Sequence, residues 1–110
     1  MNPAIEKHPG CIENTLTILG DKWTALIVRD LSASKARFGD LEASLAGISP
    51  RTLSQRLDKL EKEHIVVKRL YCERPPRYTY ELTSKGLELQ EILVKMSEWG
   101  DRHNCQKGIA

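Results

Sequence analysis

The chain has 110 residues, of which 40% are hydrophobic and 29% are charged. This length suits a single domain, and the composition is that of a globular protein, neither disordered nor embedded in a membrane. No apolar run approaches the roughly 20 residues of a membrane span, and the polar N-terminus lacks the apolar core of a signal peptide. We therefore expect one cytoplasmic domain over residues 1–110, with an N-terminal arm (1–10) and a flexible tail (104–110).

The net charge is only +2, but basic residues are concentrated in one part of the chain. Between Ser49 and Arg77 there are eight basic and four acidic residues, whereas acidic residues outnumber basic ones elsewhere. A segment of this kind attracts phosphates whatever the overall charge of the protein. Nucleic acid is therefore the first partner to consider.

The first half of the chain shows the apolar spacing of three short helices. Apolar residues recur at i, i+4 and i+7 across residues 12–19, which is typical of an amphipathic helix. Asp21 is a natural N-cap for a second helix, whose buried stripe runs through residues 23–31. A third helix is expected over residues 38–45, before a tight turn at Gly47.

A fourth helix is predicted to begin at Ser49-Pro50, because a serine N-cap followed by proline is a strong start signal. Its leucines form one buried face, and its other face is polar and basic. In the major groove, which is about 12 Å wide and admits one helix, arginine can bond guanine and glutamine can bond adenine. His64 is expected to cap the end of this helix. The candidate DNA-binding residues of the helix are Pro50, Arg51, Thr52, Ser54, Gln55, Arg56 and Lys59.

Arg56 and Lys59 lie beyond the first turns of this helix, so we expect them to contact phosphates. A basic β-hairpin follows, because residues 66–71 and 78–82 are rich in β-branched and aromatic side chains. Residues 72–77 between them contain two adjacent prolines, which do not fit inside a central strand and therefore indicate a loop. The candidate DNA contacts of the hairpin are Arg74 and Arg77.

These elements follow one another in the order of a winged helix-turn-helix. A basic face on a single helix is about as often just a solvated face. The specific signal is the combination of tight turn, Ser-Pro helix start, basic face and basic hairpin. We therefore expect a mainly helical α+β fold, a winged helix-turn-helix with a two-stranded wing and a C-terminal dimerisation helix. Its expected partner is double-stranded DNA.

Several segments are also shared with a known family. They are LGDKWT (19–24), RFGDL (37–41), ISPRTL (48–53) and PRYTYELT (76–83), together with Gly86. In these segments the chain resembles the HxlR-type winged-helix regulators, relatives of the MarR group, and the resemblance extends from about Cys11 to His103. It implies a bacterial or archaeal DNA-binding dimer that responds to chemical stress or metabolites. It also implies a recognition helix over 50–62 and a wing over 66–82.

The last helix is predicted from Thr83, as its N-cap, to about His103, and it is too apolar for a lone surface helix. We expect its apolar stripe, helped by the first helix, to form a homodimer interface. The alternative is that the stripe closes the core of a monomer. A two-fold dimer would place two recognition helices about 34 Å apart, or a multiple of that. The candidate interface residues are Leu89, Ile92, Met96 and Trp99.

The three cysteines, Cys11, Cys72 and Cys105, form neither a disulfide framework nor a metal motif. Cys11 stands just before the first helix, where backbone amides favour a reactive thiolate. Some HxlR-like proteins use a cysteine at this position to sense oxidants or electrophiles. The resulting hypothesis is a thiol switch at Cys11, with Cys105 of the partner subunit as its candidate partner. The alternative is that Cys11 is only a small buried residue.

An enzyme is not expected. The three histidines are far apart and match no metal-ligand spacing, and the sequence has no nucleophile-elbow, P-loop or dinucleotide motif. No metal or cofactor is therefore expected, whereas a small molecule or an oxidant is a candidate effector. The alternative function is a winged-helix module for protein contacts without specific DNA binding. Such modules often lose the basic face that this chain keeps.

Overall fold

Helices make up most of the structure, a computed structural model that describes residues 9–103. Within these residues the chain forms five helices and one two-stranded antiparallel sheet, and none of these helices is long and apolar enough to cross a membrane. The rest of the predicted arm, residues 1–8, and the predicted tail lie outside the described residues. In chain order the elements are α2 (Pro9–Leu19), α3 (Lys22–Ala33), α4 (Phe38–Ser44), α5 (Pro50–Lys62), β1 (Val66–Glu73), β2 (Pro76–Leu82) and α6 (Ser84–His103).

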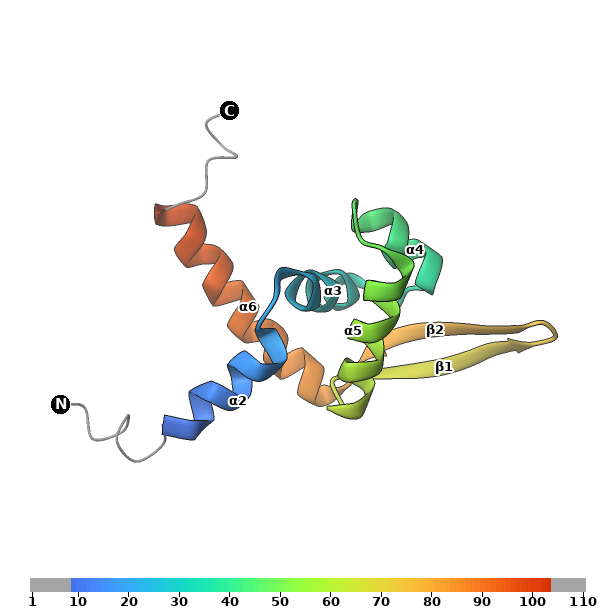
Figure 1. Ribbon diagram of the computed structural model, residues 1–110, viewed down its shortest axis with the longest axis horizontal. Coiled ribbons are helices and arrows are strands. Elements are labelled where there is room, and N and C mark those ends of the chain that lie inside the picture. The colour runs from blue at the N-terminus through green and yellow to red at the C-terminus, as the bar shows by residue number, and fades with distance from the viewer. Residues whose placement is uncertain (1–8, 104–110) are drawn as a thin grey trace.

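Helix α3 lies at the centre of the fold, and each of the other described helices contacts it, as does β2 (Figure 1). Ile27 and Val28 in α3 are completely buried. The leucines of α5 and the first half of α6 pack into the same core cluster. The hairpin projects from this body on the right of Figure 1, while α2 and the end of α6 lie on the left. The predicted winged helix-turn-helix is confirmed.

The helix starts follow the capping signals of the sequence. The Asp21 side chain accepts a hydrogen bond from the backbone N–H of Thr24 at 3.0 Å, and the Ser49 hydroxyl accepts one from the N–H of Thr52 at 3.1 Å. Both caps satisfy N–H groups that have no partner within the helix. Helix α2 begins at Pro9, within the predicted irregular arm, and proline is favourable in a first helical turn.

Both strands of the hairpin are longer than predicted, because they extend into the predicted loop over residues 72–77. Glu73 pairs with Pro76, so the turn consists of Arg74 and Pro75 alone. The proline rule for central strands does not apply here, since each strand of a two-stranded sheet has a free edge and Pro76 is the first residue of its strand. A register shift between Leu70 and Cys72 accommodates the extension.

Helix α5 ends in a turn closed by backbone hydrogen bonds. His64 adopts the left-handed conformation, with φ of 60°. Its N–H donates to the carbonyl of Glu61 at 3.0 Å, and the N–H of Ile65 donates to that of Leu60 at 2.9 Å. This pair of bonds is the usual helix stop at which glycine is preferred. His64 therefore ends the helix through its backbone conformation, just after the C-cap Glu63, whereas the prediction rested on the charge of its side chain.

Candidate nucleic-acid interface

Helix α5 has two faces of opposite character. Leu53, Leu57 and Leu60 are at most 1% exposed and anchor the helix on the core. The other side of the helix is turned outward, as the amphipathic pattern requires. The exposed predicted contacts on this helix are Pro50, Arg51, Ser54 and Gln55.

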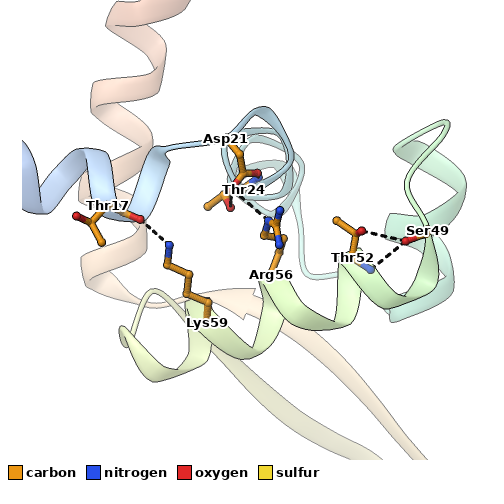
Figure 2. A network of polar contacts seen from close by, with 7 residues as sticks. All are labelled: Thr17, Asp21, Thr24, Ser49, Thr52, Arg56 and Lys59. Atoms are coloured by element: carbon orange, nitrogen blue, oxygen red, sulfur yellow. Dashed lines mark hydrogen bonds and ion pairs between the residues drawn. The ribbon is translucent and has the colours of Figure 1, made fainter.

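The other three predicted contacts of α5 are engaged within the chain (Figure 2). The Thr52 hydroxyl accepts a hydrogen bond from the Ser49 hydroxyl at 2.9 Å. The Arg56 guanidinium donates through Nε to Oδ2 of Asp21 at 3.1 Å, and the Lys59 ammonium donates to the backbone carbonyl of Thr17. Arg56 and Lys59 thus point towards α3 and α2, which the sequence pattern of α5 alone did not indicate.

Asp21 links the start of α3 to α5. Besides capping α3, its carboxylate accepts a hydrogen bond from the Thr24 hydroxyl at 3.1 Å. Partial burial by itself would raise the pKa of Asp21, but the bonds from Thr24 and from Arg56 outweigh it and hold that pKa below its ordinary value. The carboxylate is therefore charged at neutral pH and holds Arg56 in place.

The hairpin is anchored at its base and exposed at its tip. Ala36 and Tyr80 exchange backbone hydrogen bonds of 3.0 and 2.7 Å, which attach β2 to the segment before α4. The ammonium of Lys68 lies 4.4 Å from the ring centroid of Tyr78. Arg74 and Arg77 are exposed at and beside the turn, as a wing that reaches a phosphate backbone requires.

Two residues on the outer face of α5 were missed by the sequence reasoning. Lys62 and Asp58 are exposed. At 100° per residue, both project to the same side of the helix as Arg51 and Gln55. This spacing was the available signal, but the predicted contacts end at Lys59, before the last turn. Lys62 adds a cation to this face, and Asp58 adds a carboxylate that can accept from cytosine.

The opposite end of the molecule exposes apolar side chains instead. On α6, Ile92, Met96 and Trp99 are 44%, 55% and 53% exposed. Leu89 departs from the prediction, because it is only 7% exposed and belongs to the core of the chain itself. The large exposed apolar side chains of α2 are Ile12 and Leu16.

The described cysteines are free thiols. Cys11 is exposed in the first turn of α2, and Cys72 is half-buried in the wing, where its Sγ donates to the carbonyl of Arg74 at 3.8 Å. Cys105 lies outside the described residues. Within residues 9–103, no three histidine, cysteine or carboxylate side chains are grouped to hold a metal ion.

A cavity of about 370 Å³ lies between α3 and α6. Leu26 and Leu93 contribute apolar walls, and Arg29 and Glu98 bring charge to it. Gln90 also lines the cavity, and its Oε1 is buried without a hydrogen-bond partner among the described residues. Sequence reasoning had no signal for this cavity, because its lining residues are ordinary types for helix packing.

Comparison with known proteins places these features in a family. The HxlR-like helix-turn-helix family matches residues 18–107. An HTH-type transcriptional regulator of Synechocystis sp. is 36% identical, over 96% of this chain and 82% of its own length. The redox regulator HypR in its oxidised form has a similar structure, with a TM-score of 0.78 and 32% identity over 86% of this chain and 97% of HypR.

The reduced form of the transcriptional regulator YodB from B. subtilis is also similar in structure. Its TM-score is 0.75, with 33% identity over 84% of this chain and 90% of YodB. The match to the family covers the helix-turn-helix, the wing and α6. This chain is therefore a member of the HxlR-like helix-turn-helix family.

Proposed function

We propose that this chain is a transcriptional regulator that binds double-stranded DNA as a homodimer. The observation that carries the proposal is the exposed polar face of α5, which lies in the same body as a protruding hairpin with exposed Arg74 and Arg77. A major groove accepts one helix, and the neighbouring phosphates accept basic side chains of a wing. The relatives named above, which are transcriptional regulators by name, support the assignment.

The roles of the residues follow from their positions. Arg51 and Gln55 lie in the first turns of α5 and are exposed, so they contact base edges. Lys62 lies at the far end of the same face and contacts a phosphate, as do the two arginines of the wing. Pro50 and Ser54 line the approach to the groove, while Thr52 contributes through the helix cap.

The dimer is supported by the exposed apolar face at the other end of the molecule. Monomeric proteins rarely leave large apolar side chains clustered in solvent. Large apolar side chains are exposed on two helices of this chain, and a second copy of the chain would cover them. They are Ile92, Met96 and Trp99 of α6 and Ile12 and Leu16 of α2. A two-fold dimer would present two copies of α5 to a near-palindromic site.

Regulation is proposed to act through Cys11. Its thiol is exposed at the start of α2, where an oxidant can reach it. Oxidation would join Cys11 to Cys105 of the partner subunit: the two thiols lose two protons and two electrons to the oxidant, and one S–S bond forms. The similarity to HypR, which is a redox regulator by name, supports this mode. The cavity between α3 and α6 is the candidate site for a small-molecule effector.

The test is binding to a DNA fragment from upstream of the protein's own gene, before and after mild oxidation with diamide. Tight binding in the reduced state that is lost on oxidation is the expected result. In Cys11→Ser the binding should persist after diamide treatment, whereas Cys72→Ser, the control, should remain sensitive. Equal binding of the unaltered protein in both states would remove the thiol switch and leave the DNA-binding role.

The same experiment tests the competing function. A winged-helix module that serves protein contacts would bind this fragment, and unrelated duplexes at low salt, no better than a neutral protein does. Nonspecific binding is almost entirely electrostatic, so an exposed basic face that contacts DNA must show it at low ionic strength. Failure to bind any duplex there would contradict the proposed function.

A further inference from the structure

The junction between α2 and α3 is held from outside by α5. Only Gly20 and Asp21 separate the two helices, and side chains of α5 bond to both helix ends (Figure 2). Lys59 donates to the carbonyl of Thr17 in the last turn of α2, and Arg56 donates to Asp21, the N-cap of α3. Helix α5 therefore reaches the helix that carries Cys11 through hydrogen bonds and not only through the core.

The contact of Lys59 suits the C-terminal end of α2. The last carbonyls of a helix have no partner within it, and a cation is favourable there because of the helix dipole. Lys59 supplies both a donor and a positive charge for α2. The backbone is also closely packed at the junction, since a Cβ on Gly20 would lie 2.9 Å from the carbonyl oxygen of Leu16.

The contact of Arg56 with Asp21 differs from an ordinary surface ion pair, which contributes little. The carboxylate is already fixed by two hydrogen bonds from Thr24, and the two charged side chains are only 30% and 35% exposed. Lys59 lies about one turn further along the same flank of α5. Two points of attachment along one flank restrict the rotation of α5 about its axis.

We propose that Arg56 and Lys59 are positioning residues, which set the rotation of α5 relative to α2 and do not serve as phosphate contacts. This rests on the proposed function, because the rotation of α5 matters only if α5 reads DNA. Helix α2 carries Cys11 in its first turn and exposed apolar side chains. A shift of α2, on oxidation or on rearrangement of the dimer, would thus be transmitted to α5 directly through the Lys59 bond, and through the junction by the bond of Arg56 to Asp21.

The substitution Asp21→Asn distinguishes a positioning role from a general electrostatic effect, because the two predict opposite changes in DNA affinity. Removing a negative charge from a DNA-binding protein strengthens its binding if only the overall field matters. Asparagine is as good an N-cap as aspartate, so α3 keeps its start. The charge-assisted bond to Arg56 is lost, however, and we expect DNA affinity to fall by about tenfold, the value of one such bond.

Arg56→Gln and Lys59→Met are compared with Lys62→Gln, the matched control on the outer face of the same helix. The readout is the steepness of the decrease of log affinity with log salt concentration. This slope becomes smaller in magnitude by about 0.9 for each phosphate contact removed. We expect Lys62→Gln to lower the slope. Arg56→Gln and Lys59→Met should weaken binding with the slope unchanged, and Asp21→Asn combined with Arg56→Gln should lose no more than either alone.

Two results would overturn the proposal: tighter DNA binding by Asp21→Asn, or a slope in Arg56→Gln and Lys59→Met that falls as it does in Lys62→Gln. Amide hydrogen exchange over residues 17–24 tests the attachment of α5 to the junction without DNA. Exchange there should be faster in Asp21→Asn and Lys59→Met than in the unaltered protein, but unchanged in Lys62→Gln. If the unaltered protein binds no duplex, the proposed function fails and this exchange pattern alone decides whether the attachment exists.

Discussion

Helices α5 and α6 are both amphipathic, but they differ in what they leave exposed. Helix α5 buries its whole apolar face, with Leu53, Leu57 and Leu60 at most 1% exposed, and turns a polar face outward. Helix α6 buries Leu89 and Leu93 but leaves Met96 and other large apolar side chains about half exposed. Helix α5 therefore buries its apolar face within the monomer and leaves a polar face for the proposed DNA contact, whereas α6 leaves apolar side chains exposed for the proposed dimer.

The cause of the difference is position in the fold. Helix α5 contacts α3 and β1, so its apolar face is covered along its length. Helix α6 starts against α3 and β2, and its last turns extend beyond the rest of the described chain (Figure 1). An apolar stripe on a helix that extends away from the core in this way fits the proposed homodimer, in which a second copy of the chain would cover it.

The largest expected effect is that of salt concentration on DNA binding by α5 and the hairpin. If six or more phosphates are contacted by the outer face and the wing, DNA affinity should fall by roughly 10³-fold or more between 50 and 200 mM salt. Fluorescence anisotropy with a labelled duplex at several salt concentrations measures this directly. A decrease of only a few-fold would mean that α5 and the hairpin do not form a DNA-binding surface.

A charge placed on the apolar face of α6 should break the dimer. In Met96→Glu the carboxylate would be buried without a partner, which costs about 3–5 kcal/mol and raises the dimer dissociation constant by at least about 100-fold. The control is Leu87→Glu, because Leu87 is 53% exposed on the same helix but lies off this stripe. Sedimentation velocity should show monomer for Met96→Glu and dimer for Leu87→Glu; the reverse would place the interface elsewhere.

The two basic regions of the DNA-binding end should respond differently to alanine. Arg51→Ala and Gln55→Ala remove base contacts, so each should reduce discrimination between operator and altered operator by about 1–3 kcal/mol. Arg74→Ala and Arg77→Ala remove phosphate contacts and should weaken all sequences alike. Competition binding against single base-pair variants distinguishes these patterns. If the wing variants changed sequence preference instead, the assigned roles of helix and wing would be reversed.

The sequence predicted the parts of this molecule that depend on neighbouring residues, and it missed those that depend on distant ones. The caps at Asp21 and Ser49 and the leucine face of α5 are local patterns, and the structure confirms them. The bond of Arg56 to Asp21 joins residues far apart in the chain, so a helical pattern could not show that the arginine turns inward. Leu89 was misassigned for the same reason, since only the packed fold shows which part of the α6 stripe the core covers.

A smaller gain in stability is expected at the end of α5, where His64 replaces the usual glycine. A side chain in the left-handed conformation costs roughly 1–2 kcal/mol, so His64→Gly should stabilise the fold by about 1 kcal/mol after the added backbone entropy of glycine. Urea unfolding measures the change. Because His64 follows the last turn and does not lie on the outer face of α5, the salt slope of DNA binding should stay the same. An unchanged or lower stability would mean that the imidazole makes a contribution of its own.

The smallest effect is expected on stability at acid pH, and it concerns Asp21 at the junction between α2 and α3. The pKa of Asp21 is lowered in the folded chain, so its stabilising contribution is present above its unfolded value near 3.8 and is lost as the pH falls through the lower folded value. In Asp21→Asn this contribution is absent at every pH, so its stability should approach that of the unaltered protein as the pH falls from 5 to about 3.

Asp40 provides the contrast, because its pKa is also lowered but its partner Arg37 lies only three residues away. Urea unfolding of Asp21→Asn and Asp40→Asn over this pH range should show that both lose acid dependence, while only Asp21→Asn weakens DNA binding at neutral pH. Equal effects of the two on DNA binding would show that the junction has no special connection to the recognition helix.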